Sequence, residues 1–193
     1  MSMQTLALAF LAATAIGGLA WVFIYPLLSG ERKAESRRAS IARSDAPARQ
    51  AEYLNHAEYL TWRNPNVRTL GQFLLNDSGS FQSGLRTAGG ARKPAYDAYA
   101  LPVWLPSARI RAGQSLRVWG LVRAAPNNRH VQVSIQVRPR RGAPWRRVAR
   151  RATTGTRDYL STSVSVERSG QLRLVWNGRH SRAASFTVSS STT

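Results

Sequence analysis

The densest group of residues able to do chemistry is a run of arginines near the end of the chain. Residues 101–193 hold seventeen arginines, no lysine, and only Asp158 and Glu167 as acidic residues. Guanidinium groups bind phosphate and carboxylate groups through paired hydrogen bonds, so this excess predicts a surface for a polyanion, unless it reflects only a compositional preference for arginine. The arginines closest together in sequence are Arg138, Arg140, Arg141, Arg146, Arg147, Arg150 and Arg151.

Four tryptophans on or beside predicted strands offer a second kind of binding chemistry, because an exposed indole ring can stack on a sugar. The candidates are Trp104, Trp119, Trp145 and Trp176. Core packing is the more common fate of a strand tryptophan, and we expect it for Trp119 and Trp176. Trp145 stands beside Arg146 near a predicted turn, so it is the predicted sugar-stacking residue.

The carboxylates do not form a catalytic pattern. Glu52 and Glu58 fall on one predicted helix and indicate solvated charges, and Asp77 alone follows a predicted strand where an enzyme site could use it. The three histidines are isolated, the chain has no cysteine, and no phosphate-binding loop or nucleophile motif occurs. We therefore predict no catalytic residue, no cofactor, no metal site and no enzyme activity, and no motif indicates specific nucleic-acid recognition.

An uncharged apolar run occupies residues 6–28. As a helix it would be about 35 Å long, enough to cross the hydrocarbon core of a membrane. Lysine and arginine occur only after it, which predicts a single inner-membrane helix over residues 1–30 with the N-terminus outside. A cleaved signal peptide, giving a secreted or cell-surface protein, is the alternative, although the run is long and no basic residue precedes it.

The segment GGLAWVFIYPLLSGER at 17–32 and the charged KAESRRAS after it carry a family resemblance. Residues 3–45 resemble the N-terminus of TadB proteins, the inner-membrane platforms of the tight-adherence (Flp) pilus assembly system. The resemblance implies the lipid bilayer and pilus assembly proteins as partners. The family's cytoplasmic domain and further membrane helices have no counterpart here, so the resemblance covers the anchor and a charged juxtamembrane linker at 31–50.

Regular structure is predicted to return in three short elements. Apolar spacing predicts a helix at 48–62 that ends before Pro65, because the residue before a proline disfavours helical backbone. An apolar run of strand length lies at 69–75. A second helix is predicted at 94–100, with Pro94 in its first turn.

Five motifs in this stretch occur in the order found at the end of a (β/α)₈-barrel glycoside hydrolase. They are QAEYLN at 50–55, WRNPNVR at 62–68, QFLLND at 72–77, FQSGLR at 81–86 and KPAYDAY at 93–99. The resemblance covers residues 50–188 and implies a partial barrel end at 51–100, followed by a small β-sandwich. The two catalytic carboxylates of such enzymes lie on earlier barrel strands, which have no counterpart here.

Residues 101–190 alternate between apolar and polar side chains, as half-buried strands do. The predicted strands are 116–122, 131–138, 145–150, 159–166, 171–176 and 184–188. Their number and spacing predict a mainly β protein with an antiparallel sandwich of immunoglobulin or fibronectin type. Because these strands can bury a shared core, we expect residues 101–190 to fold alone.

Together these features predict a membrane-anchored, non-catalytic protein with an accessory β-sandwich of glycoside-hydrolase type. Two alternatives stay open. One is a Flp pilus assembly component, and the other is a module that binds carbohydrate or another polyanion. The two resemblances imply opposite sides of the membrane, so the side on which the β-sandwich lies also stays open.

Overall fold

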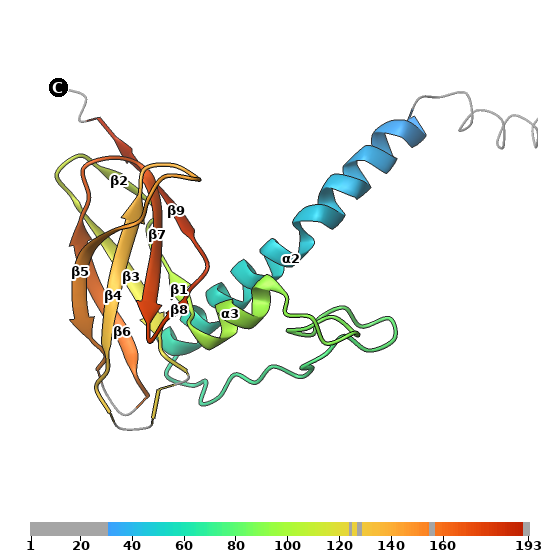
Figure 1. The fold of residues 1–193 in the computed structure, drawn as a ribbon, viewed down its shortest axis with the longest axis horizontal. Helices are drawn as coiled ribbons and strands as arrows, with labels where there is room; N and C mark the ends of the chain where they lie inside the picture. Colours follow the sequence, from blue (N-terminus) through green and yellow to red (C-terminus); the bar gives the residue numbers. More distant parts are fainter. Residues whose placement is uncertain (1–30, 124, 127–128, 155–156, 191–193) are drawn as a thin grey trace, which may run out of the picture. The chain divides into compact units, whose positions relative to one another are not determined.

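The computed structural model describes residues 31–123, 125–126, 129–154 and 157–190 (Figure 1). The chain divides into two compact units, residues 1–46 and residues 47–193. The apolar run at 6–28 lies outside the described residues, as does most of the segment that resembles TadB. Within the described part of the chain, every helix is too short or too polar to span a membrane.

Helix α2, Glu31–Arg63, is longer than the helix predicted at 48–62. The predicted linker at 31–50 is helical, because it is rich in alanine, arginine and glutamate, which have high helix propensity. Pro47 lies inside the helix, and the division between the two units falls just before it. The predicted end before Pro65 is confirmed.

The chain between α2 and the next helix has little regular structure. The strand predicted at 69–75 is wrong, because residues 64–93 form turns and isolated bridges, such as that between Asn76 and Arg86. An apolar run becomes a strand only beside a pairing partner, and no described strand pairs with this one. Helix α3, Pro94–Ala100, begins with proline as predicted.

The described residues after α3 form two β-sheets, which confirms a mainly β fold. The first sheet is antiparallel with the order β1-β3-β6, and the second has the order β2-β9-β7-β4-β5 with β8 on β7. Strand β2 pairs in parallel with β9, and the other pairs of the second sheet are antiparallel. The strands are β1 Val103–Trp104, β2 Arg109–Arg111, β3 Ser115–Leu121, β4 Gln132–Arg138, β5 Arg146–Ala152, β6 Tyr159–Ser165, β7 Gly170–Trp176, β8 Arg179–His180 and β9 Ala184–Ser189.

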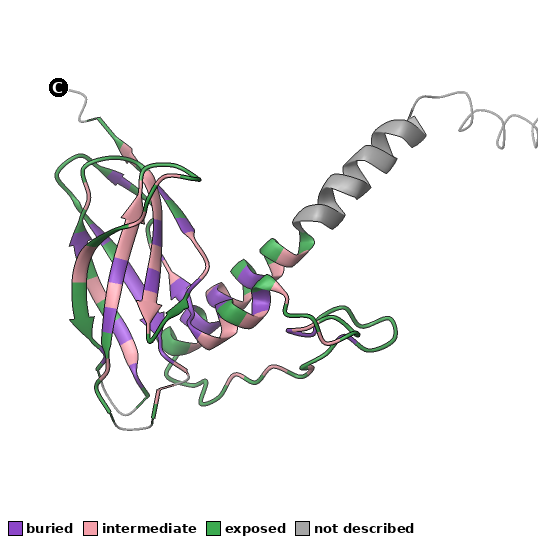
Figure 2. Ribbon diagram, in the orientation of Figure 1, coloured by how far each residue is buried: buried purple, intermediate pink, exposed green. Residues whose placement is uncertain are grey.

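The main core lies between the inner faces of the two sheets (Figure 2). Alternate residues of each strand point inward, so Leu116 and Val118 of β3 and Leu172 and Leu174 of β7 are almost fully buried. The sheets approach closely at Gly120, where a Cβ atom would lie 2.4 Å from Leu174 Cδ1. The six long predicted strands each correspond to an observed strand within two residues of either end.

A second apolar cluster lies on the outer face of the three-stranded sheet. Trp119 and Leu121 point away from the main core, yet they are only 1% and 5% exposed. Tyr59 of α2 packs on Trp119 with ring centroids 5.6 Å apart, and Trp62 contributes a further contact at 5.9 Å. The predicted boundary at residues 100 and 101 therefore falls inside one compact unit, with α2 residues on one side and the strands on the other.

Candidate anion-binding face

The outer face of the second sheet is built by the alternation of β4 and β7. On β4, Val133 and Ile135 are fully buried. Because successive side chains of a strand alternate between its two faces, Gln136 and Arg138 point outward. On β7, Leu172 and Leu174 point inward and Arg173 points outward. The sequence folds this way because the apolar residues of both strands must share one core.

Strand pairing brings arginines from three strands onto this face. Gln136 of β4 lies opposite Arg147 of β5 on one side and Arg173 of β7 on the other. Arg150 of β5 lies opposite Ser134, which shares the outward direction. We call the set Arg138, Arg147, Arg150 and Arg173 the arginine face.

Two members of the arginine face are held in place by an indole ring and by amides. The guanidinium carbons of Arg138 and Arg173 each lie 4.4 Å from the centre of the Trp145 ring. Arg138 Nε donates to Gln171 Oε1 at 2.9 Å, and Arg173 Nε donates to Gln136 Oε1 at 2.9 Å. Trp145 thus serves as a cation–π platform for two arginines, which competes with its predicted role in sugar stacking.

Charge repulsion and partial burial act on Arg173. Desolvation, and then the nearby charge of Arg138, lower the pKa of Arg173. A guanidinium group stays protonated at neutral pH despite such a shift. The sheet therefore holds two like charges close together, an arrangement that an external anion would relieve.

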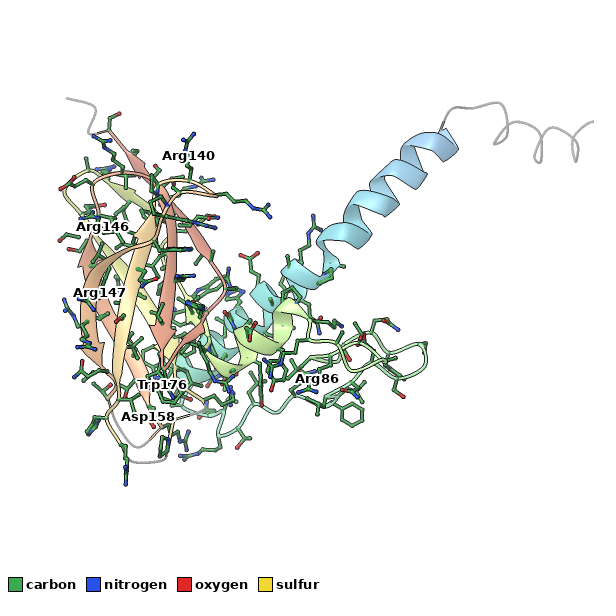
Figure 3. The ribbon with its side chains drawn as sticks, viewed as in Figure 1. Arg86, Arg140, Arg146, Arg147, Asp158 and Trp176 are labelled. Carbon is green, nitrogen blue, oxygen red and sulfur yellow. The ribbon has the colours of Figure 1, made fainter. Side chains whose placement is uncertain are left out.

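The seven predicted arginines do not all lie on one face. Arg138, Arg147 and Arg150 belong to the arginine face, while the exposed Arg140 and Arg141 lie in the turn between β4 and β5. Figure 3 labels Arg140 at this turn. Arg146 and Arg151 lie opposite Val137 and Val133, so they point toward the first sheet. Arg151 Nε donates to Thr162 Oγ1 of β6 at 3.3 Å, across the edge of the sandwich.

Three of the carboxylates in the described part of the chain have partners away from the arginine face. In the described part of the chain, the ion pairs join Lys93 to Asp77 and Arg123 to Glu58, at 3.0 and 2.6 Å. Asp158, which is buried, accepts a hydrogen bond from Thr153 Oγ1 at 2.9 Å. None of these contacts involves the arginine face. The exposed Glu167 lines one cleft with Arg138 and Arg147 but makes no ion pair in the described part of the chain, so the face keeps an excess of positive charge.

Two of the histidines, and Asp77, the one carboxylate placed where an enzyme site could have used it, have structural contacts. His56 stacks on Trp104 with ring centroids 4.3 Å apart, and His130 Nδ1 lies 3.0 Å from the Thr153 carbonyl oxygen. Asp77 accepts a backbone hydrogen bond from Gly84 at 2.9 Å in addition to its ion pair. Among the residues with described side chains, no three acidic, histidine or cysteine residues gather as a metal site would need.

Sequence reasoning missed Arg173, Gln136 and Gln171 as members of the site. The alternation in residues 171–176 shows that Arg173 points away from the core. What it does not show is which strand lies beside β7, because β4 and β7 are far apart in the sequence and only the folded register pairs them.

Comparisons with known proteins assign no family. No family model matches the sequence, and no curated protein matches it. Among solved structures, the chain is similar to a superoxide reductase (neelaredoxin) from Archaeoglobus fulgidus, with 14% identity, a TM-score of 0.33, and coverage of 46% of this chain and 87% of that chain. A likeness this weak carries no argument about fold or function.

Proposed function

We propose that the β-sandwich is a non-catalytic module that binds an acidic polysaccharide through the arginine face. The observation that supports this proposal is the gathering of Arg138, Arg147, Arg150 and Arg173 on one sheet face, away from the two ion pairs of the described residues. Three adjacent strands present these charges over a width of about 10 Å. A polymer with repeated carboxylate or sulfate groups can therefore contact several guanidinium groups at once.

The arrangement favours a repeating anion over a single small one. Each exposed contact between two charges is worth little alone in water, because the charges stay hydrated. Several contacts on one chain add up, and they release the counterions that surround a polyanion. Such binding is strongly dependent on salt and has little sequence or linkage specificity.

The experiment that tests the proposal measures heparin binding by the full chain as a function of NaCl concentration. Replacing the exposed pair Arg147 and Arg150 by serine should weaken binding and lower the slope of log affinity against log salt by about 2, because two charge contacts are lost. The matched control, Arg68→Ser with Arg117→Ser, removes the same charge from exposed positions off this face. Equal losses in both double variants would show that net charge, not the arginine face, holds the polymer.

A finer fold assignment belongs to the same proposal. The order β1-β3-β6 against β2-β9-β7-β4-β5 supports an immunoglobulin-like sandwich, because β4 pairs with β7 rather than with its neighbour β3. We infer that the module is of the accessory kind that follows glycoside hydrolase barrels. It should show no glycosidase activity, and hydrolysis of a polysaccharide that is lost in Asp77→Asn would overturn this inference.

The apolar run supports a second part of the proposal, namely that residues 6–28 anchor the module to a membrane. The run is uncharged and the basic residues follow it. The full chain should sediment with membranes, and deletion of residues 1–30 should release it. Full-length chain in the soluble fraction would refute the anchor. Co-purification with pilus assembly proteins would favour the TadB-like alternative over the polysaccharide-binding one.

A further inference from the structure

A cleft of about 730 Å³ lies at one end of the sandwich. Its walls come from the β4–β5 hairpin, from Ser165 at the end of β6 and from residues 166–169, which connect β6 to β7. Phe186 of β9 also lines it. The volume falls in the range of about 300–1,000 Å³ that is typical of small-molecule sites. We call it the sheet-end cleft.

The inner lining of the sheet-end cleft is apolar. Val137 of β4, Val148 of β5 and Val166 are partly buried and pack against the main core, and Phe186 is only 4% exposed. Pro139 and Pro144 add apolar surface at the hairpin. Part of the hydrophobic core is thus accessible from this end, because the edge strand β5 is paired only with β4 in its own sheet.

The opening of the cleft is cationic. Arg138, Arg146, Arg147 and Arg168 line it together with a single carboxylate, that of Glu167. Arg146 lies opposite Val137, so the two side chains lie on the same face of the sheet, and that face carries the apolar lining. Apolar surface and positive charge therefore meet at one site.

We propose that the sheet-end cleft binds a single-chain amphipathic anion, namely a long-chain fatty carboxylate. The alkyl chain covers Val137, Val148, Val166 and Phe186, and the carboxylate pairs with Arg146 and Arg168 at the opening. A polysaccharide lacks the alkyl part and a neutral alkane lacks the charge, so neither uses both features of the cleft. The cleft shares Arg138 and Arg147 with the arginine face, but its chemistry differs because binding there requires burial of apolar surface.

The test is a calorimetric titration of the full chain with decanoate, dodecanoate and tetradecanoate below their micelle concentrations. Affinity should rise by about fourfold for each methylene group that becomes buried. Acetate and dodecyltrimethylammonium, which lack the chain and the negative charge respectively, should bind at least tenfold more weakly than dodecanoate. Equal affinity across the three chain lengths, or equal binding of the cationic amphiphile, would overturn the proposal.

Variants separate the two halves of the site. Arg146→Ser with Arg168→Ser should weaken dodecanoate binding about tenfold or more. The matched control Arg68→Ser with Arg117→Ser removes two exposed charges outside both the cleft and the arginine face, and it should leave dodecanoate binding unchanged. Val148→Phe should fill the apolar part of the cleft and abolish binding there. The dodecanoate binding that remains in this variant measures binding at other sites, provided that its circular dichroism spectrum matches the wild type. If Val148→Phe still binds dodecanoate as the wild type does, the alkyl chain does not lie in the cleft and the proposal is wrong. Binding to anionic phospholipid vesicles without binding to free dodecanoate would also overturn it and would indicate a membrane-binding surface.

Discussion

Residues 47–93 and residues 101–190 differ in how well they cover their apolar side chains. Among the residues with described side chains, the exposed large hydrophobic residues are all in the first region. Figure 2 shows the loop after α2 as largely exposed. Phe73, for example, is 91% exposed. They are Tyr53, Leu60, Trp62, Val67, Phe73, Leu75 and Phe81. The strands bury most of their apolar residues against one another, and Trp119 and Leu121 against α2, while the region before them leaves many of its large apolar residues exposed.

The contact between the two regions is made by one stripe of α2. Ala51, Asn55, Glu58 and Tyr59 are buried, whereas Tyr53 on the opposite side of the helix is 67% exposed. Two of the buried members are polar, and both have partners, which removes most of the cost of burying them. The stripe shows that this part of α2 belongs to the sandwich rather than to a separate segment.

The largest expected effect tests whether the strands are self-sufficient. The structure favours the opposite of the sequence-based expectation that residues 101–190 fold alone, because Trp119 and Leu121 lose their cover when α2 is removed. The fragment 101–190 should be less stable than the full chain by on the order of 5 kcal/mol, which approaches the whole stability of a small domain. Urea unfolding followed by tryptophan fluorescence measures the difference.

A matched pair of variants on one helix controls for fragment artefacts. Tyr59→Ala removes the ring that packs on Trp119 and should cost about 3 kcal/mol. Tyr53→Ala removes an exposed ring from the same helix and should change stability by no more than about 0.5 kcal/mol. Equal unfolding midpoints for the two variants, or for the fragment and the full chain, would show that α2 does not stabilise the strands. The domain boundary would then lie between residues 100 and 101, as the sequence predicts.

The next effect concerns the polar contact between the regions. Asn55 Nδ2 donates to the Ala98 carbonyl oxygen at 2.7 Å, and its Oδ1 accepts from Val103 N and Arg182 Nε, both at 3.1 Å. Asn55→Ala leaves these buried groups unpaired and should cost about 3 kcal/mol, whereas the exposed Asn66→Ala should cost less than about 0.5 kcal/mol. Thermal unfolding of both variants provides the comparison, and a cost below 1 kcal/mol for Asn55→Ala would mean that water replaces the amide.

Sequence patterns predicted the six longer strands well because each carries its own signal, whereas the short strands β1, β2 and β8 were not predicted. The alternation at 131–138 identifies β4, and the turn residues between the runs separate the other strands. The failed strand at 69–75 shows the limit, since the same kind of apolar run lacks a partner there. Local pattern reports which face of a segment is apolar, and pairing decides whether the segment becomes a strand.

The candidate site was predictable only in composition. The arginine excess after residue 101 is visible in sequence, and Arg138, Arg147 and Arg150 were among the predicted residues. Arg147 and Arg150 lie on the opposite face of β5 from Arg146 and Arg151. This assignment depends on the bulge in the pairing of β4 with β5, which shifts the register between Ile135 and Gln136. A one-residue shift exchanges the two faces of a strand, so no count of arginines could have sorted them.

A smaller effect tests what orders the region between the helices. Asp77 pairs with Lys93 and with the backbone of Gly84, so Asp77→Asn should lower the local stability of residues 64–93 by about 2 kcal/mol. Limited proteolysis should then cut this region faster, while hydrogen exchange in the strands stays unchanged. Glu52→Gln, at an exposed position on α2, is the matched control and should be cut at the wild-type rate. Faster exchange in the strands of Asp77→Asn would show that the two regions unfold together.

The smallest effect is a pH dependence at His180 on β8. Burial, and then the charge of Arg173, lower the pKa of His180, while Asp97 of α3 acts in the opposite direction. The unfolded chain, with a histidine pKa of about 6.5, therefore binds the proton more readily than the folded chain does. Stability that is fully present above pH 6.5 is lost as the pH falls from there toward the folded pKa.

Because His180 is largely exposed, His180→Gln should reduce the drop in Tm between pH 7.5 and pH 5.5 by no more than about 2 °C. A larger drop in the variant than in the wild type would mean that Asp97 outweighs Arg173, so that the helical region and not the arginine-rich sheet sets the charge state of this histidine.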